Sequence, residues 1–453
     1  MRAPRPQARA SGSPEDARAP RERLLATLGE QAARHGYEQL TASQLIAAAG
    51  VSRATFYSYF ADKEACLLAA LEALAPQLLA EVDRAVACAR PEHAARAAVR
   101  ALVSFAASRP LDAHLLMAAP LAGAERLRDA RDRLLDDAAR VIDDAHWRLS
   151  PGAPVPALPA RLICAVTCRM LASRLRRGER ELAGLARELT AWLEAYELPS
   201  ERRCWRLLEA LPRSARSPYL PPDALRAPPA PAPRGARPRP DAQAEEHWLR
   251  IVVATVEVIA RDGYAGASVA SILAAAALDS RSFYRLFDGK AQALAAADEL
   301  LFRRALACAA GAFAAGETWP ERVFEAARAL VGFAEQNRSF TRVALLESHA
   351  GALAERVCDL ARAFTIFLQE GDRHRERTTA RTSEPQLEAI ATAVYELGYR
   401  HLRERPDRPL TDLLAPILFV SLAPFLGAGE AGEFVCLRLR RAREPTGLVA
   451  SAA

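Results

Sequence analysis

Residues 36–72 read GYEQLTASQLIAAAGVSRATFYSYFADKEACLLAALE, and this stretch decides the fold of the chain. Thr41 and Gln44 stand three residues apart ahead of an apolar run, which is the spacing of a capping box at the start of a helix. Gly50 suits a tight turn because glycine adopts a positive φ readily, and Ser52 suits the cap of the next helix. The stretch therefore predicts two short helices joined by a tight turn, the helix-turn-helix arrangement.

The second helix of this pair has two different faces. At helical spacing, Val51, Phe56 and Phe60 fall on the inward face. The side chains left outside are small, hydroxylic or basic, as on a helix that enters the major groove of DNA: Arg53, Ala54, Thr55, Tyr57 and Ser58. Asp62 is then expected to cap a longer helix that begins at Lys63.

The same pattern occurs a second time in the chain. Residues 263–299 read GYAGASVASILAAAALDSRSFYRLFDGKAQALAAADE and align with 36–72 without a gap, at a constant offset of 227 residues. Of the 37 aligned positions, 13 are identical. Further matches pair 101–110 with 329–338 and 124–134 with 354–364. The whole block of roughly 200 residues is therefore duplicated.

A linker separates the two copies. Residues 214–240 read SARSPYLPPDALRAPPAPAPRGARPRP, and proline at this density prevents a helix. We therefore divide the chain into six segments. They are a disordered basic arm at 1–20, a helix-turn-helix domain at 21–70, a helical regulatory and dimerisation domain at 71–212, the linker at 213–242, a divergent helix-turn-helix-like domain at 243–297 and a second helical domain at 298–445.

Composition favours a folded, mostly helical protein: 51% of the 453 residues are hydrophobic and 26% are charged. The net charge of +6 does not identify a DNA-binding face. Counting arginines against acids gives about +2 for residues 1–20 and about +5 for residues 213–240. The rest of the chain is therefore close to neutral.

Other function classes find little support in the sequence. The eight cysteines follow no apolar leader, so we expect a cytoplasmic protein without a disulfide framework. The apolar run 413–429 contains Pro416 and Pro424, and we interpret it as a buried interface helix and not as a membrane span. No motif typical of an enzyme or a metal site occurs. We therefore expect no catalytic activity, no metal and no cofactor.

The run GVSRATFYSYFADKEACL, residues 50–67, resembles the DNA-binding signature of the TetR family of bacterial transcription regulators. The resemblance covers roughly 20–212 and, less closely, 243–445. It implies an all-α fold of two units, each a helix-turn-helix domain plus a helical ligand and dimerisation bundle, which form an intrachain pseudo-dimer. The implied function is a ligand-responsive transcriptional repressor. Its partners would be double-stranded operator DNA and a small-molecule inducer, with further homodimerisation left open.

The resemblance also implies roles for individual residues. The groups that would contact phosphates, and so fix the position of the protein on the duplex, are Thr41, Ser52, Tyr57, Tyr59 and Lys63. The groups that would face base edges are Arg53, Ala54, Thr55 and Ser58. Among these, Arg53 suits guanine.

The second copy departs from the pattern where Gly50, Ser52, Tyr59 and Glu64 become Ala277, Asp279, Leu286 and Ala291. Asp279 places a negative charge where a phosphate would approach. Basic and hydroxylic groups nevertheless remain, and the expected DNA contacts are Ser268, Ser280, Arg281, Tyr284, Arg285 and Lys290. Lys63 and Lys290 are the only lysines in the chain and are equivalent, which indicates a shared function, with plain inheritance as the alternative.

Candidate ligand-binding residues in the first bundle are Phe105, His114, Met117 and Trp147, although core packing explains them equally well. The second bundle offers a more aromatic set: Phe324, Phe333, Phe364 and Phe367. We predict at most one inducer per chain, held by one bundle. The bundles are expected to meet through 161–196 and 386–425. Two alternatives stay open: only the first unit binds DNA and the second dimerises or senses, or the protein is a small-molecule sensor that does not bind DNA.

Overall fold

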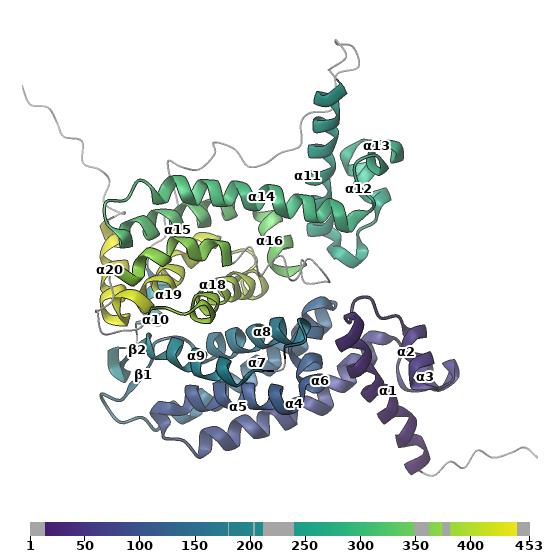
Figure 1. The fold of residues 1–453 in the computed structure, drawn as a ribbon, viewed down its shortest axis with the longest axis horizontal. Coiled ribbons are helices and arrows are strands. Elements are labelled where there is room, and N and C mark those ends of the chain that lie inside the picture. Colours follow the sequence, from purple (N-terminus) through teal and green to yellow (C-terminus); the bar gives the residue numbers. More distant parts are fainter. Residues whose placement is uncertain are drawn as a thin grey trace, which may run out of the picture.

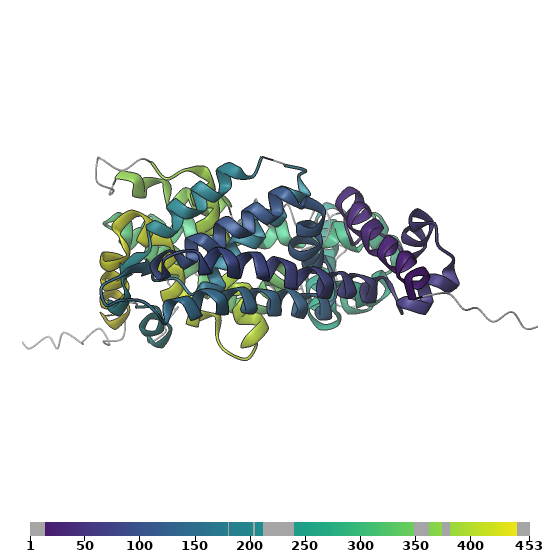
Figure 2. The same ribbon diagram turned by 90° about the horizontal axis from the view of Figure 1, so that it is seen from below.

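The computed structural model describes residues 14–179, 181–202, 204–211, 240–347, 362–373 and 381–441. It consists of two helical units that lie side by side, with their helix-turn-helix domains, called the heads below, toward the same end (Figures 1 and 2). The predicted all-α fold of two units is confirmed. Most of the predicted linker lies outside the described residues.

The first unit begins with a three-helix head, α1 (Pro14–His35), α2 (Ala42–Ala49) and α3 (Arg53–Tyr59). Its bundle contains α4 (Lys63–Ala87), η1 (Pro91–His93), α5 (Ala94–Ser108), α6 (Pro110–Ala113), η2 (His114–Ala118), η3 (Ala119–Ala122), α7 (Glu125–His146), α8 (Ala160–Arg176), α9 (Ala183–Glu194), η4 (Ser200–Arg202) and α10 (Trp205–Ala210). Strands β1 (Pro154–Pro156) and β2 (Glu197–Pro199) pair antiparallel, with Val155 opposite Leu198.

The second unit repeats this plan. Its head contains α11 (Pro240–Gly266), α12 (Val269–Ala276) and α13 (Ser280–Tyr284). Its bundle contains α14 (Lys290–Phe313), α15 (Trp319–Gln336), α16 (Arg338–Leu346), η5 (Phe364–Phe367), η6 (Gln369–Arg373), α18 (Glu384–Glu404), η7 (Leu410–Leu413), α19 (Leu414–Leu426) and α20 (Ala428–Arg441).

Two predicted segment boundaries are wrong. The helix α1 begins at Pro14, so residues 14–20 are helical and do not belong to a disordered arm. The helix α11 begins at Pro240, inside the predicted linker. Proline is well tolerated in the first turn of a helix, and the residues that follow each of these prolines include good helix formers.

The two bundles share one apolar core, which joins the first unit to the bundle of the second, while the second head has a core of its own. In the contact between the bundles, α18 packs against α8 and α9, as the sequence predicts, and α19 packs against α10, which lies beyond the predicted range 161–196. The buried Tyr196 hydroxyl donates a hydrogen bond across it to the carbonyl oxygen of Val420 at 2.8 Å. The units are therefore joined by a continuous packed interior and not only by the linker.

Two helices of the structure, α4 and α19, are strongly apolar. The helix α19 is buried along almost its whole length, so residues 414–426 of the run 413–429 form an interior helix, as predicted; the helix ends before Gly427, and residues 427 and 429 are exposed. Among the described residues, α4 is long and apolar enough by length and composition to cross a bilayer. In the structure α4 packs against α1, α5 and α7, and one face of it, including Leu67 and Leu71, is buried.

The turn of the second head contains a strained residue. Gly50 ends α2 with φ +62°, and its equivalent Ala277 ends α12 with φ +50°. For a residue with a Cβ, this left-handed backbone conformation raises the free energy of the folded state by about 1–2 kcal/mol. The buried Arg250 supports the turn by donating to the carbonyl oxygen of Ala276 at 2.6 Å.

We predict that Ala277→Gly stabilises the second head by about 1 kcal/mol, because the strain outweighs the entropy that glycine adds to the unfolded chain. Gly50→Ala is the reciprocal control and should destabilise the first head by a similar amount, since a Cβ at Gly50 meets no atom within 4 Å. Native-state hydrogen exchange of the α2 and α12 amides measures both effects. Equal protection in variant and parent would contradict the assignment of strain.

Candidate nucleic-acid interface

Local capping builds the first head as the sequence predicts. The Thr41 hydroxyl accepts the amide of Gln44 at 3.2 Å, and the Gln44 side chain accepts the amide of Thr41 at 2.8 Å. Ser52 accepts the amide of Thr55 at 3.0 Å and so begins α3. These bonds satisfy amides that a helix start leaves without partners, and they set where α2 and α3 begin.

The outer face of α3 is exposed. Phe56 and Phe60 are buried, whereas Ser52, Arg53, Ala54, Tyr57 and Ser58 are exposed together with Thr41; Thr55, Tyr59 and Lys63 are half-buried. The Tyr57 ring stands edge-on to Phe56, with 5.2 Å between ring centroids, and 54% of the residue is exposed. The Arg53 guanidinium donates to the Ser43 hydroxyl of α2 at 3.0 Å. Most of the predicted contact residues of the first head therefore share one accessible surface.

The two lysines form a contact that sequence reasoning missed. Lys63 donates to the carbonyl oxygen of Tyr37 at 2.9 Å, with its ammonium 4.2 Å from the centre of the Tyr37 ring. Lys290 does the same with Tyr264, at 2.6 Å and 4.4 Å, and also donates to Ala267 at 2.8 Å. Burial lowers the pKa of both lysines.

Each lysine therefore ties the first turn of a long helix to the segment before the helix-turn-helix, and a compact ammonium stacked on a ring suits this contact. The signal was present in the sequence, because a Gly-Tyr pair precedes both motifs at the same offset. The proposed phosphate contact of Lys63 and Lys290 stays a prediction beside this structural role.

The second head keeps the plan with a shorter recognition helix. Ser268 forms a capping box with Ser271, and Asp279 accepts the amide of Ser282 at 2.8 Å. That amide bond holds the pKa of Asp279 below its usual value, so the negative charge predicted here is present. The helix α13 has 5 residues where α3 has 7. The residues predicted to contact DNA are exposed at Ser268, Ser280, Arg281, Tyr284 and Arg285, and half-buried at Lys290.

The four candidate ligand residues of the first bundle lie in different surroundings. Phe105, His114 and Met117 are buried core residues, and burial lowers the pKa of His114 to about 4. The prediction for Trp147 is wrong: it follows the last residue of α7 and 87% of it is exposed, because the helix ends there and leaves the ring outside the bundle.

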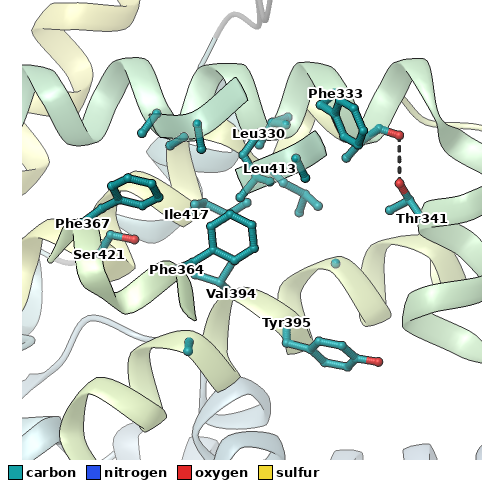
Figure 3. Close-up of a pocket in the computed structure, with 18 of the residues that line it drawn as sticks. Leu330, Phe333, Thr341, Phe364, Phe367, Val394, Tyr395, Leu413, Ile417 and Ser421 are labelled. Atoms are coloured by element: carbon teal, nitrogen blue, oxygen red, sulfur yellow. Dashed lines mark hydrogen bonds between the residues drawn. The ribbon is translucent and has the colours of Figure 1, made fainter. Parts of the chain in front are cut away.

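A cavity of about 270 Å³ lies in the second bundle (Figure 3). Its walls come from α14, α15, α16, η5, α18, η7 and α19. Of the aromatic residues predicted there, Phe333, Phe364 and Phe367 line it; Phe324 is buried but does not.

The polar groups of the cavity wall are mostly engaged. The Thr341 hydroxyl donates to the carbonyl oxygen of Ala334 at 3.0 Å, and that of Thr365 to Arg362 at 2.7 Å. The Tyr395 hydroxyl donates to Leu345 at 3.0 Å. Asp298, which is only 2% exposed, and Ser421 also line the cavity. The rest of the wall presents mainly aromatic and aliphatic carbon to an occupant.

Comparison with known proteins agrees with the duplication. The family model described as "Bacterial regulatory proteins, tetR family" matches the chain twice, at residues 24–70 and 251–297. No curated protein sequence is significantly similar to the chain. Among solved structures, the fatty acid degradation regulator FadR from Bacillus halodurans is similar, with 17% sequence identity over 42% of this chain and 96% of that chain and a TM-score of 0.35.

Proposed function

Because the chain is a DNA-binding regulator of the TetR family with two units in one polypeptide, we propose that it is a ligand-responsive repressor whose two heads bind a single operator. One observation supports this above all: both heads lie at the same end of two bundles that share a packed core (Figure 1). Two recognition helices on one face can enter successive major grooves, which lie about 34 Å apart. The proposed location is the cytoplasm, where the DNA partner lies.

The two heads should read different half-sites. The first presents Arg53, Ala54 and Ser58 on α3, and the second presents Ser280, Arg281 and Arg285 at the equivalent positions. Since arginine and small side chains prefer different base edges, the two halves of the operator should differ in sequence.

Footprinting on upstream DNA of its own locus, together with the mass of the complex, tests this proposal. We expect one chain per operator and a protected site that is a poor inverted repeat. A near-perfect inverted repeat bound by two chains would instead support the alternative in which only the first unit reads DNA. The short α13 and the charge of Asp279 are the observations that favour that alternative.

The proposed inducer site is the cavity of the second bundle. An apolar cavity of about 150 Å³ is enough for benzene, so about 270 Å³ accepts a larger molecule. Apart from Asp298 and Ser421, the lining is made of apolar side chains, hydroxyls bonded to backbone carbonyls and Gly398, which favours a mainly aromatic or aliphatic compound. Such a ligand changes the affinity for DNA only if it binds the conformation with one distance between the heads better than the conformation with another.

We predict that the uncharged dye N-phenyl-1-naphthylamine binds with a stoichiometry near one per chain, measured by fluorescence titration. Ala391→Phe fills part of the cavity from α18 and should weaken dye binding at least tenfold. Ala80→Phe adds the same side chain at an exposed position of α4 and should leave binding unchanged. Two equal sites per chain, or no effect of Ala391→Phe, would contradict this assignment.

A further inference from the structure

The two central interface helices carry opposite charges. In the first unit, α8 contributes Arg161, Arg169 and Arg174; in the second, α18 contributes Glu388, Glu396 and Glu404. The helices run antiparallel, so that Arg174 pairs with Glu388 at 2.8 Å, Arg169 pairs with Glu396, and Arg161 lies 3.8 Å from Glu404. Among these pairs, every contribution of α8 is basic and every contribution of α18 is acidic.

The centre of this contact is buried. Only 1% of the Glu396 side chain is exposed, with 2% of Arg131 and 8% of Arg169. Arg131, from α7, reaches Glu396 at 2.7 Å. Burial by itself would raise the pKa of Glu396, but the two arginines hold it below its usual value, so the carboxylate stays charged between them.

The duplication makes this arrangement informative. The offset between the copies is 227 residues in the heads and 228 to 230 in the two further matches, so the duplication places Glu396 at or within about one turn of the position of Arg169. Arg169 and Glu396 therefore occupy closely corresponding places in the two units and contact each other, as happens near a twofold axis that passes through an interface. In a pair of identical units, the centre of the contact would bring two copies of Arg169, or two copies of Glu396, close together.

Not every interface pair makes this distinction. Arg403 of α18 pairs with Asp132 of α7 at 3.3 Å, and the last turn of α8 in the first unit also carries an arginine, Arg176. That contact is compatible both with a pair of identical units and with a first unit paired with a second. The pairs between α8 and α18 are therefore the ones that separate the two cases.

We propose that the α8–α18 charge pattern is a pairing code, which commits a first unit to a second unit and excludes pairing of two first or two second units. Two first units would bring Arg161, Arg169 and Arg174 together without these carboxylates, and two second units would bring Glu388, Glu396 and Glu404 together without these arginines. Burying like charges without a partner is far more costly than leaving them in water. The matching partner is the other unit of the same chain, or the complementary unit of a second copy.

Complementation between two full-length chains tests the code. One chain carries Glu396→Arg, so that the centre of the interface is basic on both of its units. The other chain carries Arg131→Glu with Arg169→Glu, so that the centre is acidic on both of its units. The two units within each chain then carry like charges at the interface, whereas a unit of one chain and the complementary unit of the other carry opposite charges. We expect differently tagged chains of the two kinds to co-purify at least ten times more than two differently tagged parent chains, whose own units already satisfy each other.

A reciprocal exchange within one chain keeps the test decisive if a single variant folds poorly. Arg169→Glu combined with Glu396→Arg preserves the charges of the cluster and should recover more than half of the loss in urea midpoint caused by Glu396→Arg alone. Glu72→Arg, at an exposed position of α4, is the control for the same charge change outside the interface. A Glu396→Arg chain with the parent midpoint, an exchange without recovery, or chains that do not complement each other would each overturn the code.

Discussion

Replacing Glu396 with glutamine is expected to destabilise the folded chain by about 3–5 kcal/mol, the cost of leaving buried charges without their counter-ion. The change keeps the volume of the side chain and removes its charge, so Arg131 and Arg169 lose the carboxylate they share. Urea unfolding followed by far-UV circular dichroism gives the difference in midpoint. A loss of unfolding free energy below about 1 kcal/mol would contradict this expectation and would mean that solvent or another acidic group compensates the charges of the two arginines.

Glu404→Gln on the same helix is the matched control. Glu404 is 37% exposed and lies 3.8 Å from Arg161, and an ion pair of that kind contributes at most about 1 kcal/mol. Replacing the whole cluster with apolar residues, Arg131→Met, Arg169→Leu and Glu396→Leu, should be close to neutral for stability. That variant should nevertheless lose the discrimination between like and unlike units, which separates specificity from stability.

The same carboxylate predicts a dependence on pH. The pKa of Glu396 lies below its ordinary value of 4.5, so its contribution to stability is complete above that ordinary value and is lost as the pH falls through the folded-state pKa. In the Glu396→Gln variant this part of the acid sensitivity should be absent. Urea midpoints of parent and variant between neutral pH and about pH 3 should therefore converge toward the acidic end.

The head could be predicted from sequence because its determinants are local. The capping boxes of Thr41 and Ser268 and the turn at Gly50 depend on residues three or four apart, and periodicity then assigns the buried face of α3. The exposure of Trp147 could not be predicted in this way, because it depends on where α7 ends relative to the rest of the bundle.

Contacts over long sequence separations escaped prediction for a physical reason. Glu396 reads as an ordinary helix carboxylate until α8 and α7 are placed against it, 227 and 265 residues away along the chain. The hydrogen bond from Lys63 to the Tyr37 carbonyl oxygen likewise could not be predicted without knowing how the chain folds between these two residues. The cavity of the second bundle is left where seven elements do not completely fill the space between them, and no single helix pattern encodes such a gap.

Arg53→Ala is expected to reduce DNA affinity by about 1–3 kcal/mol, and only at the base pair that its guanidinium contacts. The residue is exposed at the start of α3, and the Ser43 hydroxyl orients it at 3.0 Å. Because this contact reads a base edge, operators changed at that base pair should bind parent and variant equally. Competition binding with a set of single-base operator variants measures this.

Lys63→Ala should behave differently, because a phosphate contact carries no sequence information. It should weaken binding to all DNA and reduce the slope of log affinity against log salt by about one. Since Lys63 also holds the carbonyl of Tyr37, this variant should lower the stability of the first head, whereas Arg53→Ala should not. Arg140→Ala, at an exposed position of α7, controls for loss of one positive charge. Equal losses at every sequence for Arg53→Ala and Lys63→Ala would remove Arg53 from the reading face and leave α3 with phosphate contacts alone.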